Sequence, residues 1–184
     1  MALRLALASA AVVLAGFGSP AAADEVPTPT LAWTLVQLVP SPGFTVTTAD
    51  GRAAYTMRWQ LAPILYSFGV RREVTPWRAL VAEPLVRYGG SVELFVAGEY
   101  TGRGDAGDRW GVRSGARLYL PLVQHGENAA LSLGASHVYA GGANGMGLEL
   151  GFYVLYGVLG VQLTYSPPLP VGESVTLHLA VRYF

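Results

Sequence analysis

The sequence predicts an all-β chain whose antiparallel strands run up and down and close into a transmembrane barrel of eight to ten strands, with ten preferred. Apolar and polar residues alternate with a period of two in one segment after another, as in strands with two different faces. Charged residues make up only 13% of the chain, against roughly 25% in soluble domains. After residue 23, no run reaches the roughly 18 uninterrupted apolar residues of a membrane-spanning helix.

The first 23 residues have the organisation of a secretory signal peptide. Arg4 precedes an apolar run over residues 5–17, and small residues ending at Ala23 precede an acidic pair. This pattern predicts cleavage after Ala23, which leaves residues 24–184 as a single barrel domain. The chain has no cysteine, so we expect neither a disulfide nor a lipid anchor at the cleavage site.

Turn signals divide the remainder into strand-length segments. Counted back from the C-terminus, these segments are 174–184, 158–167, 146–156, 129–140, 109–123, 91–102, 78–88 and 52–68. A further segment, 31–49, contains Pro40 and Pro42 and is either two strands turning at 41–43 or an N-terminal piece laid against the barrel. Single-chain bacterial barrels have even strand numbers, so two strands here give ten. Pro63 and Pro84 cannot donate ladder hydrogen bonds, which predicts bulges at both positions.

The charged residues of the strands share the face opposite to the apolar one. In a barrel of eight to ten strands, this polar face points into a lumen barely wide enough for side chains. The predicted lumen ion-pair ladder consists of Arg58, Glu83, Arg87, Glu93, Glu99, Arg109, Arg113, Arg117, Glu149 and Arg182. We expect these groups to pair and plug the interior; the alternative is a narrow, porin-like, anion-preferring passage lined by Arg113 and Arg117.

Alternation alone does not say which face is inside, because a soluble barrel shows the same period with its apolar face inward. The heights of the aromatic residues favour a membrane barrel. If the C-terminus is periplasmic, Tyr55, Tyr88, Tyr156 and Tyr183 lie at the periplasmic strand ends, and Tyr100, Trp110, Tyr139 and Tyr165 at the opposite ends. Two such rings around a band of Leu and Val are typical of membrane-interface girdles. The same topology puts the turn at residues 50–51 on the periplasmic side, and the loops at 70–77, 103–108 and 166–173 outside.

The signal peptide, the alternating strands, the girdles and the C-terminal strand ending in Phe184 together resemble the small β-barrels of bacterial outer membranes as a broad class. The resemblance implies a Gram-negative cell outer membrane as the location. It also implies outer-membrane lipid, lipopolysaccharide and the barrel-assembly machinery as partners, with a surface or envelope protein as a further candidate. We expect a structural or surface-interaction role first, then narrow transport or lipid handling, then a lipid-modifying enzyme; a soluble barrel of the export pathway is the alternative to all three.

His137 and Glu149 are the candidate catalytic pair. Their spacing resembles outer-membrane lipid A deacylases, in which a His-x-Ser pair is followed by a glutamate at about this distance, but Tyr139 occupies the serine position here. By strand parity His137 faces outward and Glu149 inward, so the sequence favours no catalytic role. Three scattered His and no Cys predict no metal site, and no motif predicts a cofactor. A net charge of zero argues against nucleic acid as a partner.

Overall fold

The computed structural model describes residues 35, 39–48, 51–68, 76–79, 90–102, 108–123, 128–155, 159–167 and 173–181. The predicted signal peptide lies outside the described residues. The strands are β1 (Ser41–Thr47), β2 (Ala53–Ser67), β3 (Trp77–Ala79), β4 (Ser91–Gly102), β5 (Arg109–Val123), β6 (Ala129–Ala140), β7 (Ala143–Val154), β8 (Leu159–Ser166) and β9 (Ser174–Val181). No helix in these parts of the chain is long and apolar enough to cross a membrane.

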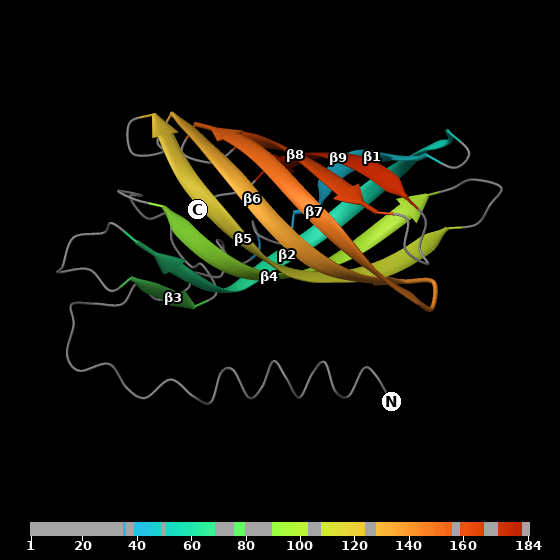
Figure 1. Ribbon diagram of the computed structural model, residues 1–184, viewed down its shortest axis with the longest axis horizontal. Coiled ribbons are helices and arrows are strands. Elements are labelled where there is room, and N and C mark those ends of the chain that lie inside the picture. Colours follow the sequence, from blue (N-terminus) through green and yellow to red (C-terminus); the bar gives the residue numbers. More distant parts are fainter. Residues whose placement is uncertain are drawn as a thin grey trace.

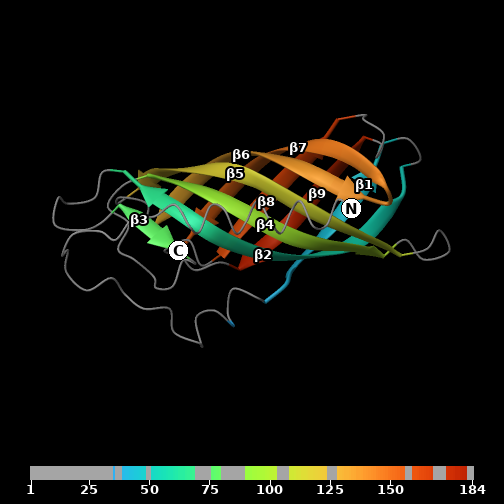
Figure 2. The same ribbon diagram turned by 90° about the horizontal axis from the view of Figure 1, so that it is seen from below.

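Eight of these strands form a closed barrel wall (Figures 1 and 2). The order around it is β1-β9-β8-β7-β6-β5-β4-β2, and β1 also pairs with β2, which closes the ring. Every neighbouring pair is antiparallel. The predicted all-β, up-and-down barrel is therefore confirmed, whereas the preference for ten strands over eight is wrong.

The error in strand number comes from the N-terminal third of the chain. The described residues of segment 31–49 supply a single wall strand, β1, and those of segment 78–88 supply only the end of the short strand β3. The last pairing of β1 with β2 is Ser41 with Arg58, and β3 pairs farther along β2, with Ala79 opposite Ile64. One edge of β2 thus accepts two short strands in succession.

The two ends of the barrel differ in their connections. At one end of the barrel, which we call the C-terminal end, β9 finishes with Val181 opposite Leu159. The strands β2, β5 and β7 also finish at this end. At the other end, here the mouth, Thr47 pairs with Ser174, and the connections β1–β2, β4–β5, β6–β7 and β8–β9 are made. The turn at residues 50–51 is therefore at the mouth, and the connection over 70–76 starts at the C-terminal end, which reverses both predicted placements. The cause is that the prediction treats 78–88 as a wall strand.

Local backbone chemistry explains the tight turns and one irregularity. Gly141 and Gly142 form a two-residue turn between β6 and β7 with φ values of 58° and 80°, the left-handed backbone that such hairpins require. Gly51 also has a positive φ of 63°. The bulge predicted at Pro63 is confirmed by a register shift between Leu61 and Ile64; Pro84 lies outside the described residues.

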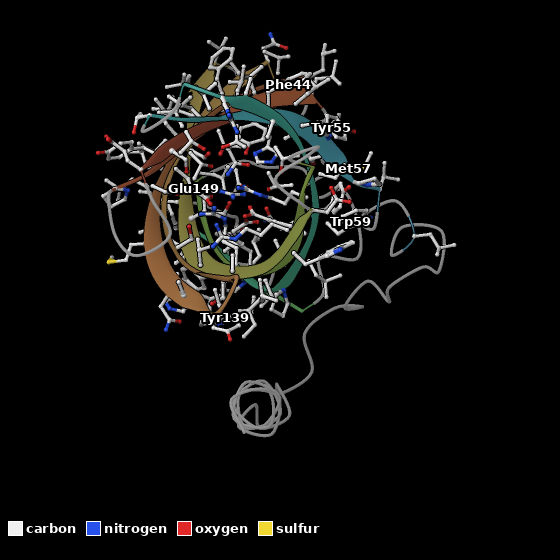
Figure 3. All side chains as sticks on the ribbon, turned by 90° about the vertical axis from the view of Figure 1, so that its right-hand side faces the viewer. Phe44, Tyr55, Met57, Trp59, Tyr139 and Glu149 are labelled. Carbon is white, nitrogen blue, oxygen red and sulfur yellow. The ribbon has the colours of Figure 1, made fainter. Side chains whose placement is uncertain are left out.

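The two faces of the wall have opposite polarity. Each of the eight wall strands exposes at least two large apolar side chains on the outside. The inside buries Arg, Glu, Gln, Ser and Thr side chains together with several small or aromatic ones. In the view along the barrel, Glu149 points inward, whereas Phe44, Tyr55 and Tyr139 lie on the outer surface (Figure 3). Polar residues thus form the interior and apolar residues form the surface.

Candidate functional site

Glu149, on β7, is the centre of the network in the lumen. Its carboxylate accepts hydrogen bonds from Arg117 Nη2, from Gln162 Nε2 at 2.6 Å and from Ser136 Oγ at 3.2 Å. Its Oε1 atom also lies 3.6 Å from Arg58 Nη1 and 3.7 Å from Arg113 Nη1. One buried carboxylate therefore contacts three guanidinium groups from two other strands, β2 and β5.

Glu99 holds two of these arginines from the side of the mouth. Arg58 Nε donates to Glu99 Oε1 at 2.6 Å. Arg113 donates through Nε to Oε1 at 2.7 Å and through Nη2 to Oε2 at 3.1 Å, which is the bidentate geometry favoured by guanidinium and carboxylate. A second carboxylate, on β4, thus joins arginines of its two neighbouring strands, β2 and β5.

Arg117 lies in the half of the lumen that is nearer the C-terminal end. It donates through Nη1 to Glu93 Oε1 at 2.8 Å and to the Tyr119 hydroxyl at 3.0 Å, and its guanidinium lies 4.6 Å above the Phe95 ring. Tyr119 also donates to Glu93 at 3.0 Å. The side chains of Arg117 and Glu93 are both fully buried. This part of the lumen is therefore filled by an arginine and a glutamate that are paired with each other.

Between Arg117 and the C-terminal end, aromatic and small side chains fill the lumen. Tyr119 and Tyr153 pack edge to face with ring centroids 5.6 Å apart, and they form a buried cluster with Ala130 and Ala180. Each of these residues is at most 3% exposed. The interior is thus ion-paired in the middle and filled by aromatic and small side chains toward the C-terminal end.

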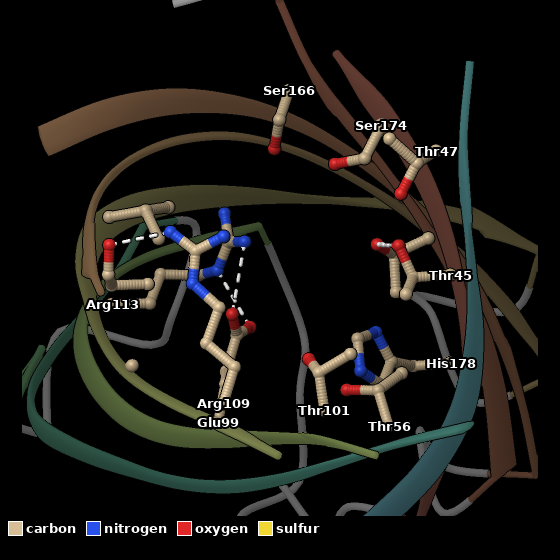
Figure 4. Close-up of a pocket in the computed structure, with 14 residues that line it drawn as sticks. Thr45, Thr47, Thr56, Glu99, Thr101, Arg109, Arg113, Ser166, Ser174 and His178 are labelled. Atoms are coloured by element: carbon tan, nitrogen blue, oxygen red, sulfur yellow. Dashed lines mark hydrogen bonds and ion pairs between the residues drawn. The ribbon is translucent and has the colours of Figure 1, made fainter. Parts of the chain in front are cut away.

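At the mouth, by contrast, the lumen keeps a pocket of about 70 Å³ (Figure 4). Half of its 14 lining residues carry hydroxyl groups, and the others include the charged side chains Glu99, Arg109 and Arg113 and the imidazole of His178. The hydroxyl side chains are Thr45, Thr47, Thr56, Thr101, Ser166, Ser174 and Thr176. Arg109 donates to the backbone carbonyl of Ala140, and Thr176 donates to Thr45 Oγ1 at 2.9 Å.

Glycines on the inner face make room for the arginines and the imidazole. A Cβ atom at position 147 would overlap Arg113 Nη1, and one at position 43 would lie 2.6 Å from His178 Cδ2. Both glycines are therefore part of the site, although they carry no functional group. This role of the glycines was not predicted from the sequence. It could have been recognised because Gly147 and Gly151 occupy inward positions of β7 between outward residues with large side chains.

The predicted lumen residues separate into three groups. Arg58, Glu93, Glu99, Arg113, Arg117 and Glu149 meet in the network described above. Arg109 lies apart from them, at the mouth. Glu83, Arg87 and Arg182 lie outside the described residues. His178, Gln60 and Gln162 were not among the predicted site residues, yet the first lines the pocket and the other two bond to the buried glutamates.

The five described aromatic residues among those predicted as girdle all lie around the outside of the mouth. Tyr100 and Trp59 both pack on Trp110, with centroid distances of 5.1 and 5.8 Å. Tyr55, which was predicted for the other end, lies here as well, in edge contact with Phe44 at 5.9 Å. Tyr139 and Tyr165 are also exposed at this end. Tyr88, Tyr156 and Tyr183 lie outside the described residues.

The candidate catalytic pair is divided by the barrel wall. His137 is exposed on the outer face, whereas Glu149 is buried inside. They are not register partners: His137 pairs with Met146, and Glu149 with Gly134. The described residues also contain no group of three or more His, Asp or Glu side chains placed to hold a metal ion.

Comparison of the chain with protein-family models, with curated proteins and with solved structures finds no match.

Proposed function

We propose that the protein is an integral β-barrel of a bacterial outer membrane, with a lumen that is closed to solutes and a structural or surface-interaction role. The observation that carries this proposal is the inverted polarity of the wall. Leu, Val, Met and aromatic side chains cover the outside on all eight wall strands, and the Arg–Glu network is inside. A soluble barrel would expose this apolar belt to water, at a cost that grows with its area; a lipid bilayer removes that cost.

Strand length and aromatic placement support the same proposal. Five of the eight wall strands have 12 or more residues, and a tilted strand needs about 9–11 to cross a bilayer. Tyr and Trp side chains cluster around the mouth, at the height where amphipathic rings meet lipid headgroups. Exposed Tyr66 and Trp77 pack on each other at the C-terminal end, so aromatic side chains lie at both rims of the apolar belt.

The closed lumen is supported by the pairing of its charges. Arg58, Arg113 and Arg117 each contact at least one glutamate inside the barrel, and the aromatic cluster of Tyr119 and Tyr153 fills the lumen below them. An anion-preferring passage would need arginines that face open water rather than carboxylates. We therefore favour the plugged lumen over transport.

Two measurements test this proposal. The protein extracted from outer membranes should need detergent to remain monodisperse and should migrate differently on a gel before and after heating, as closed barrels do. In a planar bilayer it should give no resolved single-channel openings. A monodisperse protein without detergent would refute the membrane barrel, and chloride-selective openings would refute the closed lumen.

A further inference from the structure

We propose that the pocket at the mouth binds a small oxyanion of the phosphate class, through Arg109, His178 and the surrounding hydroxyl groups. The inference concerns this pocket alone and does not depend on the compartment in which the barrel lies. It adds a binding site to a barrel whose proposed role is structural.

His178 is a buried imidazole at the wall of the pocket. Its side chain is 1% exposed, and within the described part of the chain neither Nδ1 nor Nε2 has a hydrogen-bond partner. A neutral imidazole offers one donor and one acceptor, and buried polar atoms are almost always bonded. Because the ring lines the pocket beside Thr56 (Figure 4), a ligand in the pocket is the natural partner for its N–H group.

The second argument is the way the fold holds this ring. Gly43, on the neighbouring strand β1, lies opposite His178 in the register, and a Cβ atom there would lie 2.6 Å from its Cδ2 atom. The missing side chain lets the imidazole lie close against the wall. The ring is thereby held at the side of the pocket and leaves the space open.

The third argument is the charge of the lining. Among the described residues that line the pocket, two are arginines and one is a glutamate. The glutamate, Glu99, is already shared between Arg58 and Arg113 at 2.6 and 2.7 Å. Arg109 adds a guanidinium at the rim of the pocket, and guanidinium groups match phosphate oxygens well. The lining therefore offers an oxyanion the guanidinium of Arg109 and several hydroxyl donors.

The lumen is filled on the side of the pocket that faces the C-terminal end. The pocket lies at the mouth, whereas the ion-paired network and the cluster around Tyr119 and Tyr153 fill the lumen behind it. Among the described residues, the pocket is therefore closed on the side that faces the C-terminal end. A volume of about 70 Å³ has room for a few water molecules or for one small anion, but not for a sugar chain.

Binding is tested with inorganic phosphate, titrated by calorimetry into the full-length barrel in detergent at constant ionic strength. We expect saturable binding, with a parallel shift of the His178 imidazole nitrogen resonances in the ¹⁵N spectrum of the unchanged protein. Arg109→Gln and His178→Phe should each weaken binding by about tenfold or more, as expected for a bond to a charged ligand. The matched controls are Arg52→Gln, at the exposed β1–β2 turn of the same end, and His137→Phe, on the outer face; each should change affinity less than about twofold.

A folded, heat-modifiable protein that shows neither saturable heat nor a His178 shift would overturn the proposal. So would controls that weaken binding as much as the pocket variants do. The phosphate group can be that of a free anion or of a lipid headgroup, and nanodiscs distinguish these sources. If bilayers with phosphorylated lipid A compete with inorganic phosphate and dephosphorylated lipid A does not, the headgroup is the occupant; if neither competes, the free anion is. A failure here leaves the closed lumen untouched, because conductance tests that independently.

Discussion

Replacing Glu149 with glutamine tests whether the ion-paired network determines the stability of the barrel. The substitution keeps the shape of the side chain but removes the charge that three arginines share. Its Oε1 atom is 3.6 Å from Arg58 and 3.7 Å from Arg113, and each contact corresponds to roughly 4–5 kcal/mol of Coulomb attraction at an effective dielectric constant of about 20. The net effect is smaller, because the neutral glutamine also avoids the desolvation cost of burying a carboxylate.

We expect Glu149→Gln to lower the free energy of unfolding by about 3–5 kcal/mol, the range for removing one partner of a buried pair. The assay is equilibrium unfolding by urea in lipid vesicles, followed by Trp fluorescence and by heat-modifiable migration. Ser136→Ala is the matched control, because it removes an uncharged hydroxyl that donates to the same carboxylate and accepts from Arg113 Nη1; it should cost about 1.5–3 kcal/mol, the range for hydrogen bonds to charged groups.

A second variant separates charge from packing. Arg113→Gln combined with Glu149→Gln restores equal numbers of arginines and glutamates in the network, so the double variant should be at least about 1 kcal/mol more stable than the sum of the single effects predicts. A loss below about 1 kcal/mol for Glu149→Gln, or strict additivity in the double variant, would refute the view that paired charge stabilises the lumen.

Three further predictions concern an inward-facing glycine, the outer face of the wall and the side chains that close the lumen. Gly147→Val should lower the yield of heat-modifiable protein, because a Cβ atom at this position overlaps Arg113 Nη1 and displaces that guanidinium from Ser136; a yield equal to that of the unchanged protein would contradict the packing. Leu163→Arg, on the outer face of β8, should cost about 2–4 kcal/mol in lipid vesicles if it faces the bilayer midplane. Asn144→Arg, exposed at the mouth end of β7, should cost less than about 1 kcal/mol, as expected near the membrane interface; equal effects would argue against a lipid-facing belt. Arg117→Ala combined with Tyr119→Ala should produce single-channel openings in a planar bilayer that the unchanged protein lacks, and a silent double variant would show that other side chains suffice to close the lumen.

Several features of the fold could be predicted because they depend on residues close together in the sequence. Strand parity alone separated Arg58 and Glu149 from the outward Leu and Val side chains, since successive residues of a strand point to opposite faces. The Gly-rich turn after β6 and the bulge near Pro63 follow equally from local backbone chemistry. The same parity suffices to place His137 and Glu149 on opposite sides of the wall.

The strand count and the ends depended on pairing that the sequence does not encode locally. Ser41–Thr47 becomes a wall strand because it pairs with both β2 and β9, and the second partner lies at the other end of the chain. Residues 78–88 alternate well enough to predict a wall strand, yet β3 only extends one edge of β2. Counting 78–88 as a wall strand in place of Ser41–Thr47 reverses the end at which the turn before β2 lies. Tyr55 was therefore predicted for the C-terminal end, whereas it lies at the mouth.

The sequence by itself therefore determined the fold class and the polarity of each face, because both are properties of a single strand and its period of two. Only the tertiary structure decided which strands close the ring, which arginine meets which glutamate, and that His178, Arg109 and the hydroxyl groups line one pocket. The physical reason is register: Glu149 meets Arg58 and Arg113 only when β2, β5 and β7 are curved around a common axis, and that curvature depends on hydrogen bonds between residues far apart in the chain.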